Sequence, residues 1–143
     1  MANAERTATT VWEGDLAHGN GVLSLKSGAA PDLPVTWASR TERSDGKTSP
    51  EELIAAAHSA CYSMALSNGL DKAGTPATAL DTSAEVDFVP GTGITEIRLS
   101  VRGTVPGMSA EDFVAAAEDA KANCPVSGAL AAVPSITLDA ALA

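Results

Sequence analysis

A strong helix start followed by a long apolar run restricts the fold of this chain more than any other feature. Positions 49–52 read SPEE, with a capping serine at Ser49, a proline at the first helical position and a glutamate three residues after the cap. This pattern predicts a helix that ends near Asn68 or Gly69, where the glycine can close it. Apolar residues cover nearly all of its faces, so we expect it to be buried on most sides, with another helix packed against its alanines.

Segments rich in β-branched and aromatic residues indicate strands on both sides of this helix. Three short strands are predicted before it, at 9–14, 21–26 and 35–39, and a polar loop at 41–48 leads into it. Alternation of polar and apolar residues after it predicts an antiparallel hairpin, with strands at 80–89 and 94–105.

The last third of the chain returns to helical patterns. A capping serine predicts a second helix over 109–123, a short helix follows at 124–131, and a strand is expected at 135–140. Strands before, between and after helices indicate an α+β fold. No repeat or change in composition marks a second domain, so the sequence predicts a single domain over residues 1–143.

The composition excludes several classes of partner. The 143 residues include 18 Asp and Glu against 9 Lys and Arg, which gives a net charge of −9. Such a surface disfavours nucleic acids and anionic membranes. No segment approaches the ~20 apolar residues of a membrane span, and the first residues lack the apolar core of a secretory signal. We therefore expect a cytoplasmic protein.

Two cysteines, Cys61 and Cys124, are the first candidates for chemistry. In a reducing compartment such a pair indicates buried thiols or a redox pair rather than a structural disulfide. Cys61 lies in mid-helix among apolar neighbours, which is typical of a small core residue. Cys124 precedes Pro125 at a helix start, where backbone N–H groups stabilise a thiolate. On local physics Cys124 is the more reactive of the two, unless it is merely an N-cap residue.

Three polar side chains allow both a functional and a structural interpretation. His58, three residues before Cys61, either pairs with that thiol or is a buried histidine bonded to a backbone carbonyl, and the second interpretation is favoured. Arg40 is either functional or a solvated charge at a strand end, and Glu51 is either functional or a complement to the helix dipole. His18 lies in a turn and is expected to be solvated. The spacing of the histidines and cysteines matches no zinc motif, so no structural metal is expected.

Two cysteine-containing segments resemble those of a known family. The run at 48–66, TSPEELIAAAHSACYSMAL, resembles the central helix of the OsmC/Ohr family of organic hydroperoxide reductases. The run at 121–127, KANCPVS, resembles the second cysteine motif of that family. The segments WEGD at 12–15 and ITLD at 136–139 are similar to the OsmC branch, so the resemblance covers nearly the whole chain.

This resemblance implies a fold and an activity. The fold would have antiparallel sheets packed around a long buried central helix, in an intertwined homodimer. The activity would be reduction of organic and, less efficiently, inorganic hydroperoxides, linked to osmotic and oxidative stress. Cys61 would be the peroxidatic cysteine and Cys124 the resolving one, and the two would form an intramolecular disulfide. Arg40 and Glu51 would be their polar partners, with Arg43 as the alternative arginine. No bound cofactor is implied, and an external dithiol, a dihydrolipoyl group in some members, would restore the thiols.

One physical difficulty shapes the expected site. Cys61 gains nothing from a helix dipole, so its thiolate needs a cation, and Arg40 held by Glu51 is the candidate. Glu51 and Cys61 are ten residues apart on one helix, or ~15 Å along its axis. We therefore hypothesise that Glu51 and Arg40 reach Cys61 from the partner subunit. Apolar residues around Cys61 would favour alkyl peroxides over hydrogen peroxide; they are Ile54, Ala57, Met64 and Ala65.

Two other classes of function remain open at this point. A hydrolase that uses Cys61 with His58 is the first. A redox-sensing or ligand-binding module without enzymatic turnover is the second.

Overall fold

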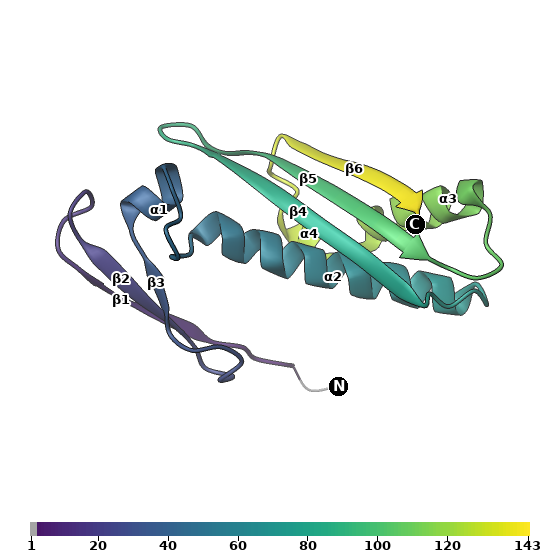
Figure 1. The fold of residues 1–143 in the computed structure, drawn as a ribbon, viewed down its shortest axis with the longest axis horizontal. Coiled ribbons are helices and arrows are strands. Elements are labelled where there is room, and N and C mark those ends of the chain that lie inside the picture. Colours follow the sequence, from purple (N-terminus) through teal and green to yellow (C-terminus); the bar gives the residue numbers. More distant parts are fainter. Residues whose placement is uncertain (1–2) are drawn as a thin grey trace. The chain divides into compact units, whose positions relative to one another are not determined.

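The computed structural model describes residues 3–143, and the chain divides into two compact units, which meet between Glu51 and Glu52 in sequence. The first unit contains an antiparallel sheet of three strands in the order β1-β2-β3 (Figure 1). These strands are β1 (Ala8–Glu13), β2 (Asn20–Leu25) and β3 (Leu33–Val35). The first two predicted strands are confirmed.

The third predicted strand, at 35–39, is wrong in most of its length. The strand β3 ends at Val35, and a short helix, α1 (Trp37–Thr41), follows. Thr36 and Ser39 form a capping box: the Ser39 amide donates to Thr36 Oγ1 at 3.0 Å, and the Thr36 amide donates to Ser39 Oγ at 2.9 Å. These reciprocal bonds satisfy backbone donors that would be unpaired at a helix start, and they override the strand preference of the tryptophan and threonine.

Helix α2 (Pro50–Lys72) begins where the sequence predicts and runs past Gly69. It ends before Gly74, whose φ of +83° is a conformation that favours glycine. Its fully buried side chains recur every four residues, and they are His58, Tyr62, Leu66 and Leu70. In the single chain the helix therefore buries one stripe rather than most of its faces, and Met64 is 71% exposed.

The second unit contains a sheet in the order β4-β5-β6, along which α2 runs (Figure 1). Strands β4 (Ala79–Val89) and β5 (Gly93–Thr104) form the predicted antiparallel hairpin. Strand β6 (Ser135–Leu142) pairs with β5 in parallel, so this sheet is not wholly antiparallel. The parallel pairing follows from the helical crossover between β5 and β6, which returns the chain to the starting end of the sheet.

That crossover consists of α3 (Ala110–Asn123) and α4 (Pro125–Ala129). Phe113 and Ala117 of α3 join Tyr62 of α2 in the core, and the Tyr62 hydroxyl donates to the Ala117 carbonyl at 2.9 Å. This contact confirms the expectation that a second helix packs against the central one. The α+β fold class is likewise confirmed.

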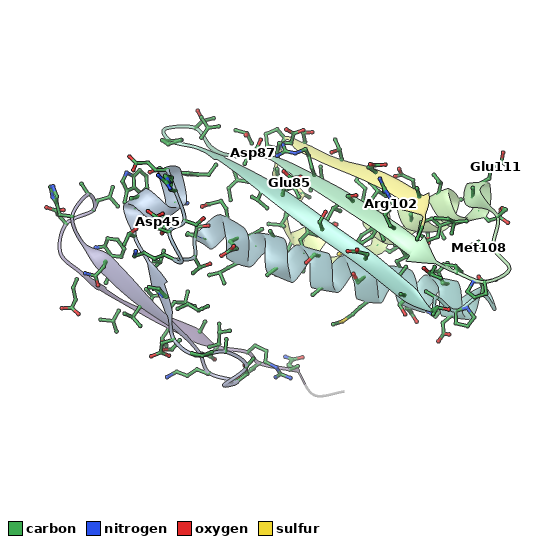
Figure 2. The ribbon with its side chains drawn as sticks, viewed as in Figure 1. Asp45, Glu85, Asp87, Arg102, Met108 and Glu111 are labelled. Carbon is green, nitrogen blue, oxygen red and sulfur yellow. The ribbon has the colours of Figure 1, made fainter. Side chains whose placement is uncertain are left out.

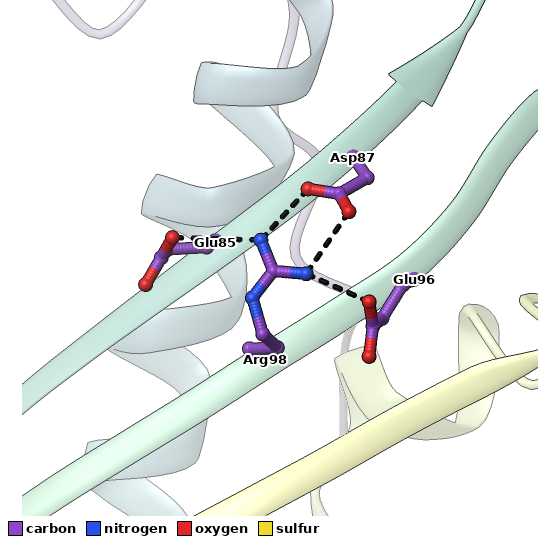
Figure 3. A network of polar contacts seen from close by, with 4 residues as sticks. All are labelled: Glu85, Asp87, Glu96 and Arg98. Atoms are coloured by element: carbon purple, nitrogen blue, oxygen red, sulfur yellow. Dashed lines mark hydrogen bonds and ion pairs between the residues drawn. The ribbon is translucent and has the colours of Figure 1, made fainter.

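The opposite face of the sheet is polar, because successive side chains of a strand point to opposite faces. Arg98 of β5 bridges three carboxylates, with Nη2 2.8 Å from Asp87 Oδ1 and Nη1 2.8 Å from Glu96 Oε2; Glu85 lies at 3.5 Å (Figure 3). Arg102 lies on the same strand (Figure 2). Its Nη2 lies 2.9 Å from Asp139 Oδ2 of β6. Such partly exposed ion pairs contribute little stability, and they mark this face as solvated. None of the described helices is long and apolar enough to cross a membrane.

Candidate active site

The second unit brings the two cysteines together. Cys61 is partly exposed on α2, and Cys124 is 1% exposed at the position just before α4. Their sulfur atoms lie 3.3 Å apart, within hydrogen-bonding distance for thiols, and both cysteines are free. A disulfide needs a separation of about 2.0 Å, so a small side-chain adjustment would join them.

The start of α4 stabilises Cys124 as a thiolate. Burial raises the pKa of this thiol, but hydrogen bonds from the Ser127 amide, Cys61, the Ser127 hydroxyl and the Val126 amide outweigh burial and bring the pKa below its ordinary value. The sequence predicted this effect of the helix start on Cys124. The contribution of the Ser127 side chain was missed, although its position three residues after the cysteine is where a capped helix brings a side chain back to its start.

The pKa of the Cys61 thiol is shifted in the opposite direction. Burial raises the pKa of the Cys61 thiol, the Val126 amide lowers it, and the neighbouring Cys124 raises it further. At this separation the two thiols titrate as a pair. In the single chain, therefore, the first proton to leave the pair comes from Cys124.

His58 is fully buried, as the favoured interpretation of the sequence expected, but its partner is different. Its Nε2 lies 2.7 Å from Ser127 Oγ, so a side-chain hydroxyl takes the place of the expected backbone carbonyl. Within residues 3–143, Nδ1 has no hydrogen-bond partner. Burial lowers the pKa of His58, which keeps the ring neutral near pH 7.

The other candidate residues, Arg40 and Glu51, are paired in the first unit. Arg40 Nε lies 3.0 Å from Glu51 Oε1 and Nη2 lies 2.9 Å from Oε2, which is a bidentate pair. The Arg40 guanidinium also lies over the Trp37 ring, 5.9 Å from its centroid. Arg43 is exposed and lies 3.9 Å from Asp45. The structure thus pairs Arg40, rather than Arg43, with Glu51; the catalytic roles of these residues stay predictions.

The described residues include no group of three or more His, Cys, Asp or Glu side chains that could hold a metal ion.

This α+β fold brings two thiols side by side, one of them at a helix start, so the two cysteines are positioned to form a disulfide. The model of the family described as OsmC-like protein matches residues 43–139. The chain is 46% identical over 131 residues to the protein named Peroxiredoxin OsmC of Escherichia coli (strain K12), with 90% of each covered. A protein of the same name from Shigella flexneri matches equally. This chain belongs to the OsmC-like family.

Solved structures share the fold. An organic hydroperoxide resistance protein from Elizabethkingia anophelis superposes with a TM-score of 0.72 at 22% identity, covering 99% of this chain and 100% of its own. A putative organic hydroperoxide resistance protein from Vibrio cholerae, with captopril bound in one active site, superposes with a TM-score of 0.74 at 20% identity, covering 97% and 94%. At these identities the likeness establishes the fold alone.

Proposed function

We infer that this chain is a cysteine-based peroxidase, as its curated relatives are named, and we propose that it reduces organic hydroperoxides with Cys61 and Cys124. The observation that carries the proposal is the 3.3 Å separation of the two free sulfur atoms, which come from positions 63 residues apart in the sequence. We propose that the protein works in the cytoplasm as a homodimer of single-domain chains.

The first step is attack by the Cys61 thiolate on the outer oxygen of the hydroperoxide. The oxygen–oxygen bond breaks, Cys61 becomes a sulfenic acid, and the alkoxide leaves with a proton as an alcohol. Cys61 is the more exposed of the two thiols, since Cys124 is 1% exposed, and this difference supports its assignment as the residue that meets the peroxide.

In the second step the Cys124 thiolate attacks the sulfur of the Cys61 sulfenic acid. A sulfur–sulfur bond forms, hydroxide leaves, and with one proton it becomes water. An external dithiol then returns both cysteines to thiols by two exchange steps and itself becomes a disulfide. The chain carries no bound cofactor in this scheme, and a dihydrolipoyl group is the reductant that the family resemblance suggests.

We further propose that Arg40 and Glu51 of the partner subunit complete each site. Burial raises the pKa of Cys61, so its thiolate needs a cation beside it. Glu51 lies on the same helix as Cys61 but ten residues earlier, or about 15 Å along the axis. If Glu51 and Arg40 instead come from a second chain that packs against the exposed side of α2, they can lie beside Cys61 despite this separation.

The apolar surface beside Cys61 supports a preference for organic peroxides. Met64, one turn after Cys61 on α2, is 71% exposed in the single chain, and Ala57 is exposed one turn before it. An alkyl group that covers these side chains is removed from water, and each buried CH₂ contributes about 0.8 kcal/mol. Hydrogen peroxide gains nothing from this surface.

Mass spectrometry tests the central proposal. One equivalent of cumene hydroperoxide added to the reduced protein is expected to remove two hydrogens and to link the peptides of Cys61 and Cys124. Cys124→Ser should instead gain one oxygen at Cys61, and Cys61→Ser should keep its mass. An unchanged mass of the wild-type chain would contradict the proposal. Steady turnover with a dithiol distinguishes an enzyme from a redox sensor, which would react once and stop.

Complementation between inactive variants tests the shared site. Arg40→Ala and Cys61→Ser are each expected to lose activity. If Arg40 acts across a dimer interface, mixing the two after subunit exchange restores about a quarter of the wild-type activity, because half of the dimers are mixed and each has one complete site. No recovery in mixtures that are shown to contain mixed dimers would place Arg40 and Cys61 of one site on the same chain.

A further inference from the structure

A chain of hydrogen-bonding groups leads from His58 to the cysteine pair. His58 Nε2 lies 2.7 Å from Ser127 Oγ. Ser127 lies three residues after Cys124 in the first turn of α4, and its side chain and amide lower the pKa of the Cys124 thiol. The Cys124 sulfur lies 3.3 Å from the Cys61 sulfur. The proposed cycle uses only the last two groups of this series and leaves a fully buried histidine without a role.

The unpartnered nitrogen of His58 determines which group donates and which accepts in each hydrogen bond of this series. Within residues 3–143, Nδ1 has no hydrogen-bond partner. A buried N–H without an acceptor costs more than a buried lone pair without a donor, so the proton of the neutral ring belongs on Nε2. Nε2–H then donates to Ser127 Oγ, and the single hydroxyl proton of Ser127 is left to donate to the Cys124 sulfur.

We propose that His58, acting through Ser127, holds the Cys124 sulfur as the thiolate that attacks oxidised Cys61 and that departs again when a dithiol attacks the disulfide. His58 is a positioning residue in this scheme, because it touches neither the peroxide nor a reacting sulfur. This inference rests on the proposed peroxidase function and deepens it.

The resolving step needs a nucleophile that is already ionised. When the Cys124 thiolate forms the new sulfur–sulfur bond, the Cys61–oxygen bond breaks and hydroxide leaves with a proton from solvent. Ser127 and His58 keep their own protons throughout. A neutral Cys124 thiol would first have to lose its proton, which lowers the rate in proportion to the thiolate fraction.

The same series determines which sulfur the reductant attacks. In thiol–disulfide exchange the sulfur with the lower pKa leaves faster. Two hydrogen-bond donors of Ser127 face Cys124, which is 1% exposed, whereas Cys61 is partly exposed. The dithiol therefore attacks Cys61, the sulfur–sulfur bond breaks, and Cys124 leaves as the thiolate that Ser127 stabilises.

Other titratable groups face this site from the neighbouring helices. Glu118 and Lys121 of α3 line, with Ser127, a cavity of about 480 Å³. From α2, Cys61 hydrogen-bonds to Cys124, and the Tyr62 phenol interacts electrostatically with both Glu118 and Cys124. Glu118, Lys121 and Tyr62 are unchanged in the variants titrated below, and Cys61 is alanine in all of them and in their parent. A difference in titration therefore reports on the His58–Ser127 series.

Titration of Cys124 alone tests the proposal without any peroxide. In a Cys61→Ala background, ultraviolet absorbance follows the thiolate against pH. Ser127→Ala is expected to lower the thiolate fraction about tenfold at a pH below the pKa, since it removes a hydrogen bond to a charged group. His58→Phe should lower the thiolate fraction by a smaller factor, because it removes the N–H that holds the Ser127 hydroxyl toward the sulfur. His58→Gln places an amide N–H where Nε2–H lies and should stay within about twofold of the parent. If His58→Phe does not fold, Ser127→Ala carries the test.

The outcome that overturns the inference is a folded Ser127→Ala and a folded His58→Phe that titrate as the parent does. A His58→Gln that behaves like His58→Phe would also overturn it, because the effect would then come from packing rather than from the N–H donor. A failure of the peroxidase proposal looks different: the titration would respond as expected while the wild-type chain stays unoxidised by peroxide.

Two measurements on the chain with both cysteines follow the cycle itself. After a pulse of cumene hydroperoxide, rapid quenching and mass spectrometry give the rates of oxidation and of disulfide formation. Ser127→Ala should lower the ratio of the second rate to the first about tenfold and should accumulate Cys61 sulfinic acid. For reduction, N-acetylcysteine is added to the oxidised wild-type chain and quenched with acid. A mixed disulfide on Cys61 is expected, and one on Cys124 would overturn the assigned leaving group.

Discussion

Arg40 holds Glu51 through two nitrogens of one guanidinium, with Nε 3.0 Å from Oε1 and Nη2 2.9 Å from Oε2. The Glu51 side chain is 7% exposed and that of Arg40 is 30% exposed, so water competes little for the carboxylate. A bidentate pair fixes the plane of the guanidinium. Glu51 therefore determines where the other N–H groups of Arg40 point.

Substitution of this arginine should remove activity, whereas substitution of the nearby Arg43 should not. Arg40→Ala loses the cation that we propose for the Cys61 thiolate, and removal of one such electrostatic group costs about 10²–10³-fold in rate. Arg43→Ala is the matched control, because Arg43 is exposed and its carboxylate partner lies 3.9 Å away. The measurement is kcat/KM for cumene hydroperoxide with a saturating dithiol. Equal losses in both variants would contradict the assignment of Arg40.

The burial of His58 predicts a loss of stability in acid. Burial lowers its pKa, so below its ordinary value of about 6.5 the unfolded chain binds a proton that the folded chain does not. This contribution to the free energy of unfolding is present above pH 6.5 and is lost as the pH falls below it. His58→Gln should reduce the decrease between pH 6.5 and 5, measured by urea denaturation.

His18 provides the control for that experiment, because its side chain is 86% exposed. His18→Gln should retain the acid-dependent loss of stability that His58→Gln reduces. A wild-type chain whose stability decreases no more than that of His58→Gln would contradict the prediction.

Met64 should influence which peroxide is preferred. Its side chain is 71% exposed and lies one turn from Cys61 on α2. Met64→Gln replaces a flexible apolar surface with a polar amide and should lower the ratio of rate constants for cumene hydroperoxide and hydrogen peroxide about tenfold, since a few buried methylene groups are worth 1–3 kcal/mol. Val114→Gln, an apolar residue of α3 that is 40% exposed, should leave the ratio unchanged. A wild-type ratio near one would contradict the proposed preference.

Gly103 is required by packing rather than by backbone conformation. A Cβ at this position would lie 2.5 Å from the ring of Phe113, which is fully buried. Gly103→Ala should therefore lower the free energy of unfolding by about 1–3 kcal/mol through overpacking. Gly128→Ala on α4 is the matched control, because a Cβ there meets no atom within 4 Å. Urea denaturation of both variants gives the comparison, and equal stabilities would show that the Phe113 ring can move without cost.

Most helices and strands could be predicted because helix caps and the alternation of polar and apolar residues depend only on residues that are close together in the sequence. The cap at Ser49, the alternation along β4 and β5 and the cap at Ser109 all predicted elements that the structure contains. The strand expected at 35–39 was wrong because Thr36 and Ser39 cap each other, and that reciprocal bond outweighs strand preference. The direction of β6 was also missed, since pairing depends on the path of the chain between strands.

The sequence by itself determined that Cys124 would precede a helix and that Cys61 would lie within one, because capping and periodicity depend on residues close together in the chain. It could not determine that Ser127 Oγ would lie 2.7 Å from His58 Nε2, or that the two sulfurs would lie 3.3 Å apart. Those distances arise only when α3 and α4 pack back against α2, burying Phe113 and Tyr62 in one core. Packing of that core, a property of the whole second unit, decides which polar groups meet.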